Sequence, residues 1–153
     1  MSRESRLTAG VLLILMPAVV YGGASILWLL IGDSSYAQNQ LRQDLWRAGH
    51  AHAGVLLVLS LVTLRYVDET NLSKNLKRLA RHSIPAAAIL LPVAFFLSVA
   101  SPDATEPNAM IYLAYVGAIS LAVGLFVLGV GLIRSGRTSH DANRTARAER
   151  GGR

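Results

Sequence analysis

Apolar residues come in four long blocks, separated by short polar stretches. The charge-free blocks run from Leu7 to Gly32, Ala48 to Leu64, His82 to Pro102 and Pro107 to Ile133. None has the period-two alternation of a half-buried strand, and each approaches the roughly 20 residues that cross a bilayer as a helix. An open sheet could not satisfy its backbone hydrogen bonds in lipid. The pattern predicts an all-α, integral membrane four-helix bundle, with helices at about 7–31, 48–66, 83–101 and 109–133.

The polar connections also carry helical periodicity. In residues 33–48, leucines recur at helical spacing, which predicts either a helix on the membrane surface or an early start of the second spanning helix. A similar leucine stripe beside a basic face in residues 68–82 predicts a separate surface helix. Residues 135–153 have no apolar stripe and are rich in Arg, Ser, Thr, Ala and Gly, so we expect a disordered cytoplasmic tail after a transmembrane domain of residues 1–134.

Composition and charge agree with a membrane protein. Hydrophobic residues make up 52% of the chain and charged residues 16%. Of the 15 Lys and Arg residues, only Arg42 and Arg47 fall between the first two predicted helices, and none falls between the last two. The positive-inside rule therefore predicts a multi-pass protein of the bacterial inner (cell) membrane with both termini cytoplasmic. This rule accounts for the net charge of +6, so we expect no nucleic-acid partner.

Small residues recur on two of the predicted helices. Gly117, Gly124 and Gly131 are spaced by seven residues on the fourth helix, and Ala18 and Gly22 form a small-xxx-small pair on the first. Such strips allow close helix packing, either inside the bundle or against another copy of the protein.

Candidate chemistry is confined to histidines. Without cysteine, disulfides, thiolate metal sites and cysteine nucleophiles are excluded. His50 and His52 are separated by about 200° around a helix, so they point to nearly opposite faces and cannot chelate one ion together. His82 and His140 belong to the predicted cytoplasmic side, which leaves Met110 on the fourth helix as a candidate partner. A His with Met can hold haem, and a His with carboxylates can hold a divalent metal.

Other roles for this pair remain open. Both rings can serve as interfacial side chains with no ligand, and proton sensing or quinone contact is also chemically reasonable.

The run R-A-G-H-A-H-A-G at residues 47–54 carries a resemblance. It is similar to a G-H-x-H motif in small uncharacterised bacterial four-helix integral membrane proteins, and loosely to the His-x-His helix of haem-copper oxidases and nitric oxide reductases. The resemblance covers eight residues and implies that His50 and His52 each contact a different haem. Because the copper-ligand histidines of that superfamily have no counterpart here, it implies an accessory or haem-contacting role.

No charged side chain lies deep in any apolar block, and no hydrolase, metalloprotease or phosphate-loop motif occurs. We therefore predict a protein without catalytic activity, an accessory or structural subunit that packs with itself or with a larger membrane complex. The alternative is a haem- or metal-binding protein using His50 or His52. A small transporter or channel is a second alternative, which the lack of buried charge disfavours.

Overall fold

The computed structural model describes the backbone of residues 1–151 and the side chains of residues 1–137. Its elements are α1 (Arg3–Gly32), α2 (Ser34–Ala37), α3 (Gln40–Glu69), α4 (Lys74–Ser98), the 3-10 turn η1 (Ala109–Tyr112) and α5 (Leu113–Gly151). No strand occurs within residues 1–151. Four helical stretches are long and apolar enough to cross a membrane, namely α1, α3, α4 and residues Ala109–Arg137. The predicted all-α class and the four apolar helices are confirmed.

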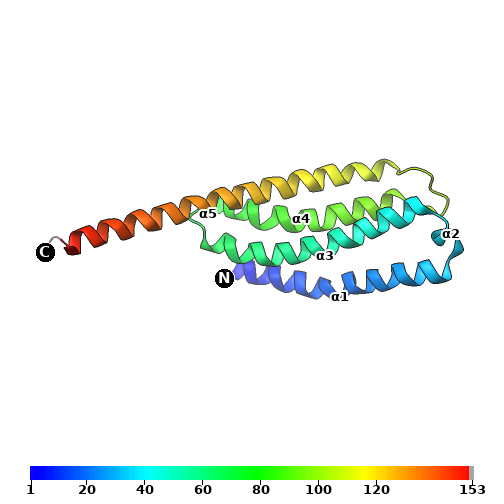
Figure 1. Ribbon diagram of the computed structural model, residues 1–153, viewed down its shortest axis with the longest axis horizontal. Coiled ribbons are helices and arrows are strands. Elements are labelled where there is room, and N and C mark those ends of the chain that lie inside the picture. Colours follow the sequence, from blue (N-terminus) through cyan, green and yellow to red (C-terminus); the bar gives the residue numbers. More distant parts are fainter. Residues whose placement is uncertain (152–153) are drawn as a thin grey trace.

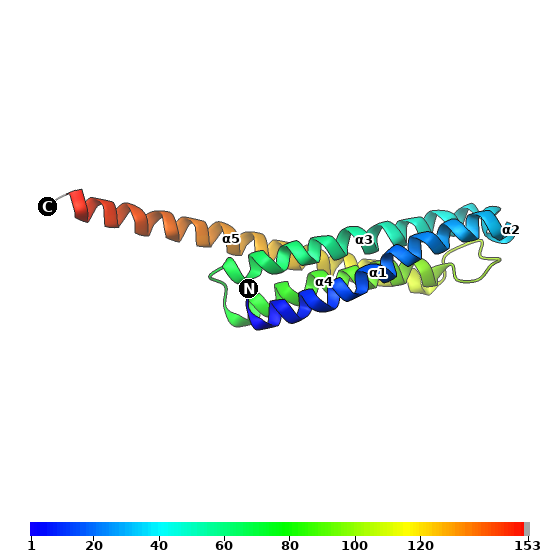
Figure 2. The same ribbon diagram turned by 90° about the horizontal axis from the view of Figure 1, so that it is seen from below.

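The long helices pack in the order α1, α3, α4, α5. In Figure 1, α5 lies along the top and α1 along the bottom, with α3 and α4 between them. In the view from below, α1 lies nearest the viewer (Figure 2). We call the end that carries α2 and η1 the α2 end, and the opposite one the N-terminal end. The packing resembles a bundle, but α1 and α5 lie on opposite sides of the α3–α4 pair.

Helix starts differ from the predicted bounds. Side chains of Ser2, Asn39 and Ser73 cap α1, α3 and α4, and each accepts a hydrogen bond from a backbone N–H in the first turn. A helix begins where a side chain satisfies these free N–H groups, not where charges end. The early start of α3 therefore agrees with one of the two alternatives for residues 33–48. The helix predicted in residues 68–82 is not a separate element, because α4 begins at Lys74 and residues 74–82 form its first turns.

The C-terminal boundary also differs. The backbone of α5 stays helical through Gly151 instead of ending near residue 133. The composition there, rich in Ala and Arg and free of proline, is compatible with a helix. Most of the predicted disordered tail, residues 135–153, lies outside the residues whose side chains are described, as does His140.

Three apolar clusters hold the helices together, two of which share Leu59 and Leu121 at their edges. Val67, Ile84 and Leu128 belong to a cluster that joins α3, α4 and α5, and a second cluster joins the same helices around Ala87. By contrast, α1 is attached to α3 through its own small cluster centred on Leu12. Consequently α1 is the least buried of the four long helices, with its far face uncovered.

The glycine strip of α5 faces the same chain. A Cβ atom at Gly124 would lie 2.8 Å from Ile84 Cγ1, and one at Gly117 would lie 3.0 Å from Leu91 Cγ. At Gly131 a Cβ would lie 2.7 Å from Leu72 Cγ. The distances at Gly124 and Gly131 are too short for a real Cβ, and the one at Gly117 is tighter than most real Cβ contacts, so α5 packs very closely against α4 and the segment before it.

A polar network closes the N-terminal end. The Arg81 side chain is 5% exposed and donates to Glu4, to Ser5 Oγ at 3.1 Å and to Asp68 Oδ1 at 3.2 Å. Ser5 Oγ also donates to Asp68 Oδ1 at 3.1 Å. Because these residues come from α1, α3 and α4, the network ties three helices together. Arg81 belongs to the predicted basic face of residues 68–82, yet it is buried.

Candidate functional site

The histidines of α3 contact different helices. The His50 ring lies against α1, where a Cβ at Gly23 would come within 2.8 Å of His50 Nε2. His52 is exposed on another face, and its ring centroid lies 5.2 Å from that of Phe95 on α4. Its Nδ1 lies 2.7 Å from the backbone oxygen of Ala48. The two imidazole rings therefore lie in separate environments.

Glycines of α1 make room for His50. A Cβ at Gly22 would lie 3.8 Å from His50 Nδ1, which is ordinary contact, whereas the 2.8 Å at Gly23 leaves no space for a side chain. The ring nitrogen Nε2 thus lies close to the backbone of α1 at Gly23.

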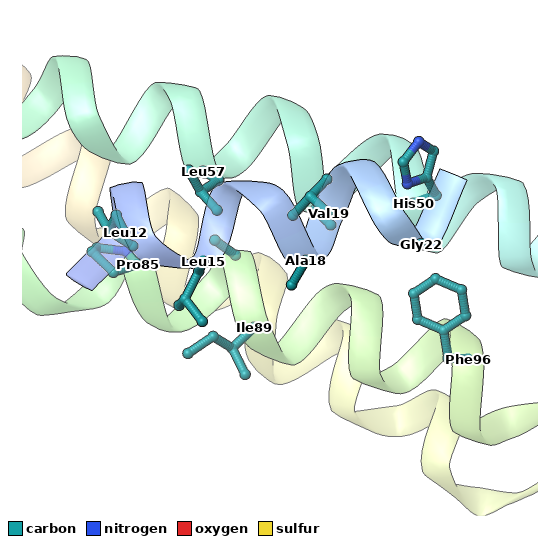
Figure 3. Close-up of a pocket in the computed structure, with 12 residues that line it drawn as sticks. Leu12, Leu15, Ala18, Val19, Gly22, His50, Leu57, Pro85, Ile89 and Phe96 are labelled. Carbon is teal, nitrogen blue, oxygen red and sulfur yellow. The ribbon is translucent and has the colours of Figure 1, made fainter. Parts of the chain in front are cut away.

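An apolar groove runs beside this contact. It has a volume of about 260 Å³ and is lined by side chains of α1, α3 and α4. His50 and Phe96 lie at one end, and Leu12 and Pro85 at the other (Figure 3). His50 is its one polar lining side chain, and it makes no hydrogen bond within residues 1–137. The groove suits an apolar chain better than a polar ligand.

The other candidate residues do not assemble into a metal site. Within residues 1–137 no group of three or more His, Asp or Glu side chains could hold an ion together. Met110 lies on η1 with 38% of its surface exposed and makes no hydrogen bond to either histidine. Ala18 lines the groove, next to Gly22 on the same face of α1. Of the two histidines, His52 is the more exposed.

A second organised region lies at the α2 end. Asp33 caps α2 by accepting from Ser35 Oγ at 2.6 Å and from the backbone N–H groups of Ser35 and Tyr36. These bonds, chiefly the one from the Ser35 hydroxyl, hold the pKa of Asp33 below its usual value. The side-chain amide of Asn39 donates to the carbonyls of Pro102 and Ala104. The α2 turn is thereby fixed to the loop between α4 and η1.

Fold and site together define the class as an all-helical protein with four helices able to cross a membrane. Comparison with protein-family models, curated proteins and solved structures gives no match. The resemblance of residues 47–54 to His-x-His helices therefore stays a prediction.

Proposed function

We propose that this protein is a non-catalytic subunit of the bacterial inner membrane that assembles with a second copy of itself through α1. Both termini are placed in the cytoplasm, as the distribution of Lys and Arg predicts. The observation that carries the proposal is a polar and aromatic strip on the uncovered face of α1.

This strip consists of Tyr21, Ser25 and Trp28, which share one helix face through their spacing of four and three residues. Tyr21 is 75% exposed and Trp28 is 70% exposed. Trp28 is close to the end of α1, where indoles favour the membrane interface. Tyr21, however, lies near the middle of the charge-free block 7–32, and its hydroxyl has no partner within residues 1–137. At this depth lipid offers no partner either, which favours a neighbouring helix.

The glycine strip of α5, the other candidate surface for association, is already covered by α4. The α1 strip is free of such contacts, and Ala24 and Ser25 allow a close approach beside Tyr21. A two-fold axis next to these residues would pair the same face of both copies and give a closed dimer.

Cysteine cross-linking tests this arrangement, because the chain has no native cysteine. We expect Ala24→Cys to give a disulfide-linked dimer in oxidised membranes, since the two Cα atoms would lie within about 7 Å. The matched control is Ile119→Cys on the exposed face of α5, which should remain monomeric. Adding Tyr21→Phe to Ala24→Cys should reduce the dimer yield. Equal cross-linking at both cysteine positions, or none at residue 24, would contradict the proposal.

Haem binding through His52 is the second candidate function. With the Nδ1–H donated to the Ala48 carbonyl, the lone pair of Nε2 faces away from the helix, as it does in histidines that ligate metals. A haem held there would supply redox or ligand-binding chemistry. His50 fits haem less well, because its Nε2 faces Gly23.

The haem candidate predicts a Soret absorption band in protein purified from haem-supplied cells. We expect the band to persist in His50→Ala and to disappear in His52→Ala. Colourless wild-type protein, or a band that survives His52→Ala, would eliminate this candidate.

A further inference from the structure

An aromatic cluster surrounds Arg42 at the α2 end. Tyr36 on α2 and Trp46 on α3 have ring centroids 5.5 Å apart, and Trp46 meets Phe96 of α4 edge-on at 5.8 Å. The guanidinium carbon of Arg42 lies 5.0 Å from the Trp46 ring centroid and 5.6 Å from that of Tyr36. Tyr36 has no exposed surface, and Arg42 is 5% exposed.

Each of these three side chains has a buried polar atom without a partner. The atoms are Tyr36 Oη, Arg42 Nη1 and Trp46 Nε1, and no other residue in 1–137 has such a buried side-chain atom. Buried polar groups nearly always find a hydrogen-bond partner. Three exceptions in one cluster indicate a site that receives an external group.

Within residues 1–137 the buried charge of Arg42 forms no ion pair with a carboxylate, although it acts electrostatically on Asp33. The described hydrogen bond of Arg42 runs from Nε to the Val99 carbonyl at 3.3 Å. Asp33 is engaged in capping α2, and Asp44 accepts from Gln40. By contrast, Arg81 is equally buried and is paired with two carboxylates. Burying an unpaired charge is energetically costly, so an anion bound beside Arg42 would stabilise this cluster.

The three unpartnered groups can all donate hydrogen bonds, which indicates a ligand that accepts them. Guanidinium and indole N–H groups only donate, and a phenol can donate as well. The planar guanidinium matches the geometry of carboxylate and phosphate oxygens. We propose that Tyr36, Arg42 and Trp46 bind an oxyanion, a phosphate group from either a lipid headgroup or free phosphate. The three atoms are closed to solvent, so binding requires the cluster to open.

Trp46 provides the probe for a test. The chain has two tryptophans, so Trp28→Phe leaves Trp46 as the sole indole. In phosphate-free neutral detergent, this variant is titrated with sodium phosphate at constant ionic strength and, separately, with short-chain phosphatidylglycerol. We expect a saturable change in Trp46 emission with at least one of the two. A response to phosphate identifies a free ion, whereas a response to the lipid alone identifies a headgroup.

Variants decide whether the response belongs to this site. In the Trp28→Phe background, Arg42→Met should abolish it, and Arg65→Met, which removes an exposed charge at the far end of α3, should leave it unchanged. Tyr36→Phe removes one hydroxyl from a folded core and should weaken binding on the order of tenfold, even if Arg42→Met fails to fold. The proposal is overturned by no response to either titrant, or by a response that Arg42→Met and Tyr36→Phe leave intact.

Discussion

Gly124→Leu is expected to destabilise the folded chain by about 3 kcal/mol, near the upper end of typical overpacking costs. A Cβ at this position would lie 2.8 Å from Ile84 Cγ1, 3.0 Å from Ser83 Cβ and 3.4 Å from the Ile84 backbone nitrogen. Backbone and Cβ atoms cannot move aside as the end of a flexible side chain can, so α4 and α5 must separate. Reversible unfolding in mixed micelles with added dodecyl sulfate, followed by circular dichroism, measures the loss.

Gly129→Leu is the matched control. It makes the same substitution on the same helix, and no heavy atom lies within 4 Å of the added Cβ. We expect a change within about 0.5 kcal/mol, as for other substitutions away from packed features. Similar losses at positions 124 and 129 would show that helix propensity, and not the contact with α4, determines the effect.

Arg81→Met is the second substitution with a large expected effect, a loss of about 3–5 kcal/mol in the free energy of unfolding. It leaves Asp68, whose side chain is 16% exposed, without its cationic partner and removes the bond to Ser5. The same micelle titration measures it. Adding Asp68→Asn should recover part of the loss, because the uncompensated charge is then gone.

Arg78→Met is the control for Arg81→Met. Arg78 lies on α4 one turn before Arg81 but is exposed, so its replacement should change stability little. If both variants lose equal stability, or if Asp68→Asn gives no recovery, the buried network does not contribute as its geometry indicates.

Much of the fold follows from the sequence, because long apolar blocks without period-two alternation favour helices. Apolar blocks of membrane-spanning length predict the four helices, and they are present. The spacing of His50 and His52 predicts opposite faces, and the two rings contact α1 and α4. The first residue of each helix is harder to predict from the sequence. It depends on a local capping hydrogen bond, such as the one to the Asn39 side chain, inside a polar stretch.

The buried arginines show what the sequence does not predict. In the sequence, Arg42 and Arg81 are both basic residues close to apolar blocks, yet in the structure both are buried to the same extent. The leucine periodicity around Arg42 gave the one hint that its segment is helical and packed. Nothing in the sequence could reveal that Arg81 pairs with Glu4 and Asp68, whereas Arg42 contacts aromatic rings and forms no ion pair within residues 1–137.

The sequence by itself thus determined the helical class, the four apolar helices and the faces on which small residues and histidines lie. Only the tertiary structure decided what lies opposite each face: α4 against Gly124, α1 against His50, and α2 over Arg42. The physical reason is that periodicity arises from local backbone geometry, which each stretch of sequence carries within itself. Neighbours depend on contacts between residues far apart in the chain, and these form only when the helices pack.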